Sequence, residues 1–406
     1  MNILIITENF FPEVNASARR IYERAVYWVK LGCHVTVVTG APNAPRGKIY
    51  EGYKNRWHQI EYIEGIKVVR TKSFIAGRKK FMARLLNYLS LMVMSFFTAL
   101  FEKNHDVILV NSPQFFILIS GWLLAKIQRQ PLVFEIADLW PASVVAFNLI
   151  RQNLLVRTIE RMELFLYRQA DAIIALTKYI KSDMVRRGIV EEKISVIRNG
   201  VDEYGPLMRD AKLAESLDLQ HKFVIGYLGN HGHANALENV VAAAAYLKKN
   251  EAIHFLFVGD GVGRNALIDL AKQKQLDNIT FIPLQKRDRI NDYWSLCNVG
   301  LVHLKNHPLF SGALPLKLYK ALAMHLPIIL AAPRGEASDL IEEVGVGVWV
   351  EPESPIALAN TVLSLYENRH CIKQFSENAQ AAAPHYTRKK QALQVFEVIS
   401  QAVNMY

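Results

Sequence analysis

Short apolar runs alternate with helix-length segments of mixed polarity along most of the chain. Between residues 223 and 332, the runs FVIGYL, HFLFV, NITFI and VGLVHL are each short enough for a buried parallel strand. Glycines at the ends of such strands allow tight turns and let a phosphate approach backbone N–H groups. This half of the chain therefore predicts a nucleotide-binding α/β domain.

The first 200 residues show the same alternation and predict a doubly wound α/β fold, with a helix over Ala16–Leu31. A turn-rich stretch, Asn199–Pro206, separates the two halves. We therefore predict an N-terminal domain over 1–203, a second domain over 204–384 and a terminal helix over 385–406. The strands predicted in the first domain are Ile3–Thr7, His34–Thr39, Asp106–Val110, Leu132–Ile136, Ala172–Leu176 and Ile194–Ile197.

The segment Phe81–Phe101 has 16 apolar residues in 21, which is long enough to span a bilayer. Its polar residues nevertheless fall on one side of a helical wheel, and a predicted strand follows at once. A spanning helix would place that strand on the wrong side of the membrane. We favour a helix packed on the first domain and dipping into a membrane interface, and an ordinary core helix and a true span remain as alternatives.

Charge is distributed unevenly over the 406 residues, whose formal net charge is +11. Residues 1–200 carry 28 Lys and Arg against 16 Asp and Glu, whereas residues 201–406 carry 20 against 21. The basic half favours an anionic partner, such as lipid head groups or a lipid-linked pyrophosphate, over a merely solvated surface. Motifs typical of nucleic-acid binding are absent from the sequence, so nucleic acid is not an expected partner.

The three cysteines, Cys33, Cys297 and Cys371, lie far apart and fit a reducing cytosol. The sequence opens with an apolar run and no basic leader, which predicts a first strand and not a signal peptide. Clusters with metal-ligand spacing are absent, so neither a metal site nor a cofactor is expected.

Two places carry candidate chemistry on residue pattern alone. Asp138 follows a predicted strand, where ligands of open α/β sheets bind, although a lone Asp there is as often a turn or cap residue. Gly229–Gly232, with the sequence GNHG, ends the first strand of the second half and precedes a helix predicted to start near Ala236. Backbone N–H groups and a positive helix end would make this loop a diphosphate cradle.

The segments HVTVVTGAPNAPRGKIYEGYKNR, DLWP, GNHG, VGDG and PxKLY together resemble family 4 retaining glycosyltransferases. The likeness covers almost the whole chain and is greatest to bacterial enzymes that transfer N-acetyl-fucosamine and related amino sugars. It implies a GT-B fold, in which two Rossmann-like domains face each other across the active site and the last helix crosses back to the first domain. It also implies transfer, with retention and without metal, from a nucleotide sugar to a lipid-linked saccharide.

The same resemblance assigns roles to individual residues. Asp138 would line the acceptor pocket as base or polar anchor, and it is the expected catalytic residue. The family's first loop, which approaches donor phosphates and acceptor, corresponds to Glu13, Asn15, Ala16 and Arg20. The expected donor-binding residues are Gly229, Asn230, His231, Gly232, Pro283, Lys317, Leu318 and Lys320.

Several positions depart from the family pattern. Ala137 stands where many relatives have His, and Glu135 could supply the lost contact with a sugar hydroxyl. Asn15 and Ala16 replace the first-loop glycines, although Asn tolerates a left-handed backbone. His233, Ala234 and Asn235 follow the GNHG loop, where many relatives have an Arg and a Lys, which leaves Lys317 as the candidate phosphate ligand.

The motif that holds the donor ribose is also altered, because Lys320 replaces its Glu and Gly312 replaces the earlier one. An ammonium group cannot accept hydrogen bonds from ribose hydroxyls. Asp339 or Glu336 could compensate for the lost carboxylate.

The expected activity is transfer of an N-acetylated 6-deoxyhexosamine from a UDP-sugar in O-antigen or capsule synthesis. The enzyme would sit on the cytoplasmic face of the inner membrane and contact its anionic surface. The alternative is a catalytically impaired, glycosyltransferase-like partner or scaffold of the same pathway, and the altered ribose motif favours that alternative.

Overall fold

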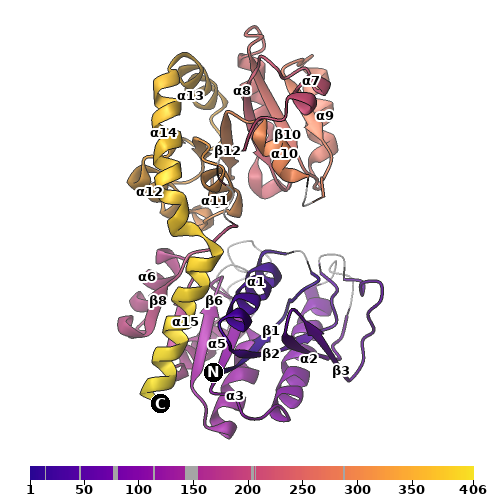
Figure 1. Cartoon of the computed structure of the whole chain (residues 1–406), viewed down its shortest axis with the longest axis vertical. Coiled ribbons are helices and arrows are strands. Elements are labelled where there is room, and N and C mark those ends of the chain that lie inside the picture. The colour runs from indigo at the N-terminus through magenta and orange to yellow at the C-terminus, as the bar shows by residue number, and fades with distance from the viewer. Residues whose placement is uncertain are drawn as a thin grey trace. The chain divides into compact units, whose positions relative to one another are not determined.

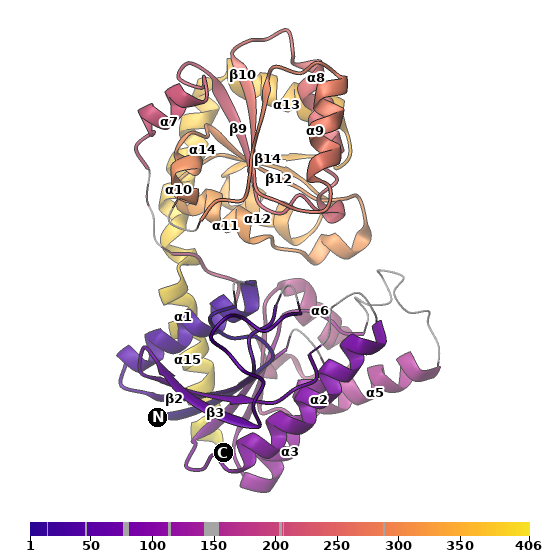
Figure 2. The same cartoon turned by 90° about the vertical axis from the view of Figure 1, so that its right-hand side faces the viewer.

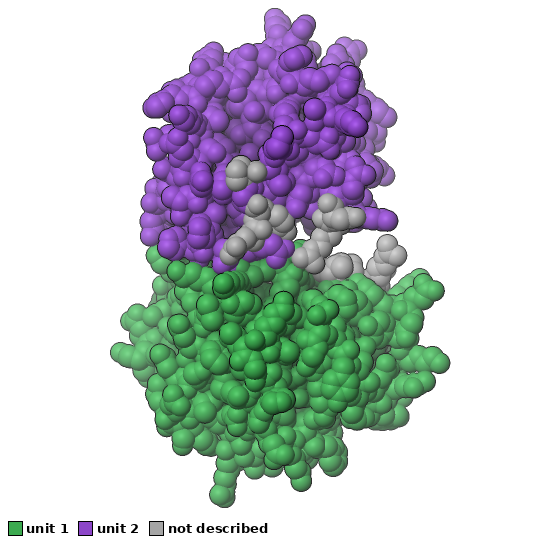
Figure 3. Space-filling model, viewed as in Figure 1, with its two compact units in different colours: residues 1–200, 388–406 green, residues 201–387 purple. Residues whose placement is uncertain are grey.

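The computed structural model describes every residue except 14, 45–46, 76–80, 113–114, 142–153, 203–204, 206 and 287–288. The chain forms two compact units, which Figure 3 shows in different colours. Unit 1 comprises Met1–Gly200 and Arg388–Tyr406, and unit 2 comprises Val201–Thr387. The predicted divisions, after residues 203 and 384, fall in the same two connecting stretches.

Unit 1 is built on an eight-stranded sheet in the order β3-β4-β2-β1-β5-β6-β7-β8. Neighbouring strands run parallel except for the pair of β3 and β4. The strands are β1 Asn2–Thr7, β2 His34–Gly40, β3 His58–Ile63, β4 Ile66–Thr71, β5 Val107–Ser112, β6 Leu132–Ile136, β7 Ala172–Ala175 and β8 Ile194–Val196. The helices are α1 Ala16–Lys30, α2 Phe81–Leu100, α3 Phe116–Gln128, α5 Leu154–Gln169, α6 Lys178–Arg186, η1 Glu191–Lys193 and α15 Arg388–Met405.

Alternate residues of the strands in unit 1 contribute to two separate cores, because successive side chains of a strand point to opposite faces. Ile3 and Ile5 of β1 pack in the core that contains α1 and α15. Leu4 and Ile6 pack in the core that contains α2, α3, α5 and α6. Helices therefore cover both faces of the sheet, as a doubly wound fold requires (Figure 1).

The last helix, α15, belongs to unit 1. Val395, Ile399 and Ala402 lie on one face of the helix and are buried in the core shared with α1. The buried Trp28 of α1 donates its indole N–H to the carbonyl oxygen of Ala392 at 2.9 Å. The predicted return of the terminal helix to the first domain is confirmed.

The hairpin of β3 and β4 is the part of unit 1 that the sequence pattern did not predict. Its two-residue turn consists of Glu64 and Gly65, which have φ of 50° and 81° and join the paired Ile63 and Ile66. Positive φ at both turn residues is the geometry that suits a tight hairpin. The strand β3 alternates exposed and half-buried residues, so its apolar content is too low to stand out as a buried strand.

Unit 2 has a six-stranded parallel sheet in the order β11-β10-β9-β12-β13-β14. Its strands are β9 Phe223–Leu228, β10 Ile253–Val258, β11 Ile279–Ile282, β12 Val299–His303, β13 Ile328–Ala331 and β14 Gly347–Val350. Its helices are α7 Ala211–Ser216, η2 His233–Asn235, α8 Glu238–Tyr246, α9 Arg264–Gln273, α10 Ile290–Ser295, η3 Pro308–Gly312, α11 Leu316–Ala323, α12 Glu336–Val344, α13 Pro355–Glu367, α14 Arg369–Ala382 and η4 Ala383–Tyr386. One face is covered by α8, α9 and α13, and the other by α10, α11, α12 and α14.

The long apolar segment forms α2, which connects β4 to β5 and lies against the sheet of unit 1 (Figure 2). Its window Met82–Leu100 is the one described stretch long and apolar enough to cross a membrane. The strands on either side of α2 belong to the same sheet, which disfavours the spanning alternative. A pure core helix does not fit either, because only 22% of that window is buried.

Candidate active site

Both sheets have a point where the strand order reverses. In unit 1, β1 lies between β2 and β5, and in unit 2, β9 lies between β10 and β12. Ligands of open parallel sheets bind outside the carboxyl ends of the strands at such points. At these two carboxyl edges lie Asp138, just after β6, and the GNHG loop, directly after β9.

The GNHG loop of unit 2 leaves β9 and packs against the turn that follows β10. A Cβ atom on Gly259 would lie 1.9 Å from the carbonyl oxygen of Gly229, so the two loops approach as closely as glycine permits. The His231 N–H donates to the Asp260 carbonyl, and the Gly263 N–H donates to the His231 carbonyl, both at 2.9 Å. The turn after β10 therefore holds the GNHG loop in shape.

The predicted diphosphate cradle is wrong in two details. The N–H groups of Gly229 and His231 are already bonded, to the carbonyls of Val258 and Asp260, so they do not point to a ligand. The helix expected near Ala236 begins only at Glu238, because the short turn η2 precedes it and Ala236 adopts a left-handed φ of 42°. The positive helix end therefore lies further along the chain than the pattern suggested.

His231 is buried under the loop, with 1% of its surface exposed. Neither ring nitrogen has a hydrogen-bond partner among the described residues. Its neighbours are the rings of Tyr227 and Phe257, both with centroids 5.9 Å away. Burial, aided by the charge of Arg264, lowers the pKa of His231 to about 4, so the ring is neutral near pH 7. Asn230, in contrast, is exposed.

Lys317 lies beside the loop, in the first turn of α11. Its ammonium donates to the Tyr227 hydroxyl at 2.6 Å and to Asn235 Oδ1 at 3.0 Å. It also lies over the Tyr227 ring, 4.0 Å from the centroid. A Cβ on Gly229 would come within 3.8 Å of its Nζ. Desolvation lowers the pKa of Lys317 to about 7, because these neighbours are neutral.

The other predicted donor-binding residues separate into distinct environments. Leu318 is fully buried in the core of unit 2, which contradicts a direct ligand contact. Lys320 is partly buried on α11, and Pro283 is exposed directly after the edge strand β11. Glu336 and Asp339, the two carboxylates that could replace the missing Glu of the ribose motif, differ in burial.

Glu336 is buried in the first turn of α12, whereas Asp339 is exposed. A Cβ on the preceding Gly335 would lie 2.1 Å from the carbonyl oxygen of Ser311, so this helix start packs against the segment that contains Gly312. Glu336 is therefore the better candidate to replace the missing carboxylate.

In unit 1, the first loop leads into α1 through Asn15. Its side-chain oxygen accepts a hydrogen bond from the Ala18 N–H at 2.9 Å, and Ala16 is the first helical residue. Asn15 has φ of −74°, so the left-handed conformation expected from the family glycines is wrong. The residue instead acts as an N-cap, for which Asn is among the best side chains.

Glu13 holds the same loop from within. Its carboxylate accepts hydrogen bonds from the backbone N–H groups of Asn43, Ala44 and Phe10, at 2.8, 2.7 and 3.1 Å. Burial raises the pKa of Glu13 in spite of these bonds. Its contacts therefore fix the shape of two loops, and they occupy both carboxylate oxygens.

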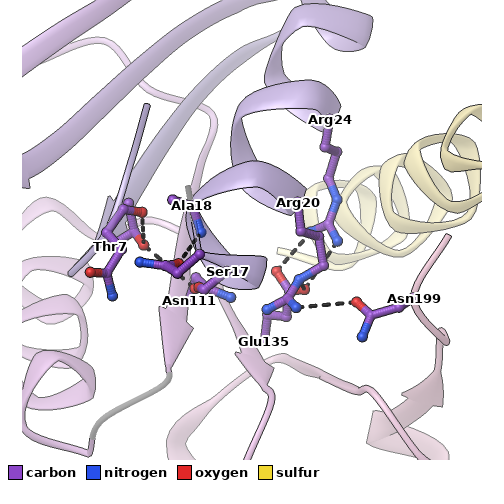
Figure 4. Close-up of polar contacts among 10 residues, drawn as sticks. Thr7, Ser17, Ala18, Arg20, Arg24, Asn111, Glu135 and Asn199 are labelled. Carbon is purple, nitrogen blue, oxygen red and sulfur yellow. Dashed lines mark hydrogen bonds and ion pairs between the residues drawn. The ribbon is translucent and has the colours of Figure 1, made fainter. Parts of the chain in front are cut away.

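A buried ion cluster joins α1 to the end of β6 (Figure 4). Arg24 binds both oxygens of Glu135, at 2.7 and 3.0 Å, and Arg20 Nε lies 2.8 Å from the same carboxylate. Arg20 also donates to Asn199 at 3.2 Å. Burial opposes ionisation, but the two arginines outweigh it and lower the pKa of Glu135 to about 2.

This cluster corrects two predictions. Glu135 is fully buried and bound by arginines, so it does not offer its carboxylate to a sugar hydroxyl in place of the residue lost at Ala137. Arg20, expected to approach the donor phosphates or the acceptor, is buried and contacts Glu135 and Asn199.

A second polar group at this edge was missed by the sequence analysis. Asn111, at the end of β5, accepts a hydrogen bond from the Ser17 hydroxyl at 2.7 Å, and Thr7 Oγ1 lies 3.5 Å from the same oxygen (Figure 4). Thr7 and Asn111 are paired in neighbouring strands at the point of reversal. Polar residues that end two adjacent apolar strands were the signal that could have revealed them.

Asp138 follows β6 and is exposed, whereas the next two residues, Leu139 and Trp140, are buried. The Trp140 ring stacks on Phe115 with centroids 5.9 Å apart. This packing holds the backbone on which Asp138 is displayed at the carboxyl edge of the sheet. Pro141 ends the DLWP segment, and the residues that follow it, 142–153, lie outside the described residues.

A buried acid near this edge was also missed. Glu163 of α5 accepts a hydrogen bond from Tyr167 at 2.8 Å and pairs with Arg187 at 2.6 Å. Burial raises the pKa of Glu163 to about 7. Burial is the main cause that raises the pKa of Tyr167, Glu163 raises it further, and the charge of Asp138 makes a smaller contribution that connects this group electrostatically to Asp138. Groups of three or more potential metal ligands are absent from the described residues.

Two family models divide the chain in nearly the same way as the structure. Residues 17–203 match "Glycosyltransferase Family 4", and residues 209–382 match "Glycosyl transferases group 1". The Anabaena protein HepE, solved in complex with UDP, has the same fold at 19% identity, with a TM-score of 0.75 over 99% of this chain and 100% of its own. The chain has the two domains of a GT-B glycosyltransferase.

Similar proteins include bacterial polysaccharide glycosyltransferases. A protein of Escherichia coli strain K12, named as the colanic acid biosynthesis glycosyl transferase WcaI, is 27% identical over 379 residues, 88% of this chain and 90% of its own length. The glycosyltransferase WbjE of Pseudomonas aeruginosa is 27% identical over 277 residues, 65% of this chain and 67% of its own length. The predicted GT-B fold is thus confirmed, and each half of the chain matches a glycosyltransferase domain model.

Proposed function

We propose that this glycosyltransferase transfers an N-acetylated 6-deoxyhexosamine from a UDP-linked donor to a lipid-pyrophosphate-linked saccharide. The reaction would proceed with retention, without a metal, in bacterial O-antigen or capsule synthesis on the cytoplasmic face of the inner membrane. A relative named for colanic acid biosynthesis, a second relative named as a glycosyltransferase and a structural neighbour solved with UDP support the proposal.

The observation that carries the proposal is the setting of Lys317. Its amine lies beside the GNHG loop, and its described partners are the neutral Tyr227 and Asn235. A donor diphosphate bound at this edge would supply the missing negative charge and raise the pKa of Lys317. Stabilising the leaving group in this way is the largest contribution expected for such a reaction.

The bond changes follow from that arrangement. The acceptor hydroxyl oxygen forms a bond to the anomeric carbon, and the bond from that carbon to the β-phosphate oxygen breaks. The electron pair leaves with UDP on the face that the acceptor attacks, which preserves the anomeric configuration. Asp138 would receive the hydroxyl proton or orient the hydroxyl while the departing phosphate takes the proton.

The ribose contact requires a different carboxylate from the family's usual one. We assign this role to Glu336, because Lys320 cannot accept a hydrogen bond from a hydroxyl. Glu336→Gln should weaken UDP binding about tenfold or more, since a hydrogen bond to a charged group contributes roughly 1.5–3 kcal/mol. Asp339→Gln, at the exposed neighbouring position, is the matched control.

Calorimetric titration with UDP, GDP and UDP-N-acetylhexosamines tests the proposal, with Lys320→Glu measured alongside. Micromolar binding of UDP by the natural sequence would support an active transferase and would be followed by an acceptor screen. Loss of transfer in Asp138→Asn, with UDP binding intact, would then assign the chemical step to that residue.

The second candidate function is a catalytically impaired partner or scaffold in polysaccharide assembly. The observation that favours it is Lys320 in the ribose motif. If the natural sequence fails to bind UDP and Lys320→Glu restores binding, the donor site has been lost in this chain. That outcome would replace the transferase proposal with the partner protein.

A further inference from the structure

The helix α2 presents its apolar side to the outside and its polar side to the fold. Met82, Leu86, Val93 and Phe97 recur at intervals of four, seven and four residues, which places them along one stripe of a helix. Their side chains are 44–63% exposed, and Phe101, just past the helix, is 78% exposed. A helix on the surface of a water-soluble domain normally shows the opposite pattern.

Ser90, Ser95 and Thr98 of α2 are hydrogen-bonded to other segments of unit 1. Ser95 Oγ donates to Ser120 Oγ of α3 at 3.2 Å, and Thr98 Oγ1 donates to Thr71 Oγ1 of β4 at 2.9 Å. In the middle of the helix, Ser90 accepts a hydrogen bond from the Phe74 N–H at 2.7 Å. The polar stripe seen in the sequence is therefore the packed side of α2, and the apolar stripe is left for another environment.

The neighbouring helices extend the apolar face. The helices α2 and α3 pack side by side (Figure 2), and Gln128 at the end of α3 donates to the Glu102 carbonyl at 3.0 Å. Leu123 and Ile127 of α3 are exposed, as is Phe165 of α5, whose ring packs edge-on against Trp122 of α3. Exposed apolar patches of this kind mark sites of protein or membrane interaction.

The charges around this face are almost all positive. No Asp or Glu occurs in the sequences of α2 and α3. Arg84 is exposed near the start of α2, and Lys126 and Arg129 are exposed at the end of α3. Arg157 and Arg161 are exposed on α5. Glu160, which lies between them in the sequence, is partly buried. Basic groups that border an apolar face match an anionic lipid surface.

We infer that the apolar face of α2 and α3 inserts into the acyl boundary of an anionic lipid monolayer, with α2 lying in the plane of the membrane. Lys126 and Arg129 would contact the lipid head groups. The inference names the partner surface for the proposed function, but vesicles without any acceptor test it separately.

The test is flotation of the full chain with vesicles of phosphatidylcholine containing one quarter phosphatidylglycerol. Phe97→Glu should reduce the bound fraction at least tenfold. Ile356→Glu is the matched control, since Ile356 is also on a helix and is 57% exposed, in unit 2. This control should bind as the natural sequence does, and both variants should keep their thermal unfolding midpoint because each replaced side chain is largely exposed.

A second pair of measurements separates charge from insertion and from self-association. Lys126→Gln with Arg129→Gln should weaken binding to the anionic vesicles and leave any residual binding to pure phosphatidylcholine unchanged. Vesicle binding that Phe97→Glu leaves intact would overturn the inference. It would also be overturned by a natural chain that ignores vesicles and forms a dimer which Phe97→Glu dissociates, because the occupant would then be a second copy. Calorimetry with UDP on Phe97→Glu should match the natural sequence, so failure here is distinguishable from failure of the transferase proposal.

Discussion

The positively charged side chains at the carboxyl edges of the two sheets have different kinds of partner. In unit 1, Arg20 and Arg24 are buried against Glu135, so the fold supplies a carboxylate that the two guanidinium groups share. In unit 2, the described partners of Lys317 are a hydroxyl, an amide oxygen and an aromatic ring. A cation balanced within the chain mainly stabilises structure, whereas a desolvated cation with neutral partners is suited to an anion that arrives with the ligand.

The pKa shifts express the same contrast. The arginines lower the pKa of Glu135 to about 2, so this carboxylate stays ionised throughout the physiological range. Desolvation lowers the pKa of Lys317 to about 7, so its charge is easily lost until a partner binds. The comparison assigns the unit 1 cluster to stability and Lys317 to donor binding, and each assignment can be tested by removing one charge.

The largest effect is expected from Glu135→Gln. It leaves Arg20 and Arg24 buried without a counter-charge, which should lower the free energy of unfolding by about 3–5 kcal/mol. Because the folded pKa of Glu135 lies below its unfolded value of 4.5, its contribution is present above pH 4.5 and is lost as the pH falls toward 2. Urea unfolding between pH 2 and pH 7 measures both effects.

The matched control for this variant is Glu191→Gln. Glu191 pairs with Lys181 at 3.1 Å but its side chain is 62% exposed, so its loss should cost no more than about 1 kcal/mol. Equal destabilisation by the two variants would contradict a structural role for the buried cluster.

The next largest effect is expected from Lys317→Met, and it concerns binding. Loss of a charged hydrogen-bond donor to the diphosphate should weaken UDP affinity by roughly 1.5–3 kcal/mol, or about ten- to more than a hundredfold. Stability should be unchanged or slightly raised, because the buried amine pays a desolvation cost that the thioether does not. Calorimetry and thermal unfolding on the same sample separate the two.

Lys373→Met is the control for nonspecific loss of a positive charge, since the pair that Lys373 forms with Glu377 on α14 is exposed. A large loss of stability in Lys317→Met, with UDP affinity preserved, would reverse the assignment and make Lys317 a structural cation like those of unit 1.

The pH dependence of donor affinity should show the charge of Lys317 directly. The free enzyme has a pKa of about 7 at this residue, and a bound diphosphate raises that value. Affinity should therefore be constant below pH 7 and fall about tenfold, roughly 1.4 kcal/mol, per pH unit above it until the bound pKa is reached. UDP-N-acetylglucosamine is the suitable probe, because its pyrophosphate diester does not titrate there. If the donor affinity of the natural sequence does not change with pH, the charge of Lys317 does not contribute to donor binding.

Sequence pattern was sufficient for the fold class because most strands of the two sheets are apolar runs separated by helix-length segments. The run Leu132–Ile136 was predicted with its observed bounds for this reason. The hairpin of β3 and β4 was missed, because β3 is an edge strand with half of its positions in water. Its turn, Glu64-Gly65, was too weak a signal by itself.

The site was harder to predict than the fold, because local pattern does not show which groups satisfy one another. The arginines that occupy Glu135 come from a helix more than a hundred residues earlier, and only the packing of α1 on the sheet brings them together. The backbone N–H groups of Gly229 and His231 are bonded to a turn some 30 residues later in the chain, for the same reason. Predictions that rested on a single loop therefore failed where a distant partner took the same atoms.

The smallest effect is expected at the start of α1 and tests whether the first loop needs glycine-like freedom. Asn15→Ala removes the cap on the Ala18 N–H and should cost about 1 kcal/mol of stability, whereas Asn15→Asp should cost little. Because φ of Asn15 is −74°, Asn15→Gly relieves no strain and should lower stability by a few tenths of a kcal/mol. Urea unfolding resolves this order. A stabilised Asn15→Gly variant would show that the loop prefers the left-handed conformation of the family glycines. UDP affinity should stay the same in all three variants, since the Asn15 side chain caps α1 in unit 1, whereas Lys317 and its described partners lie in unit 2.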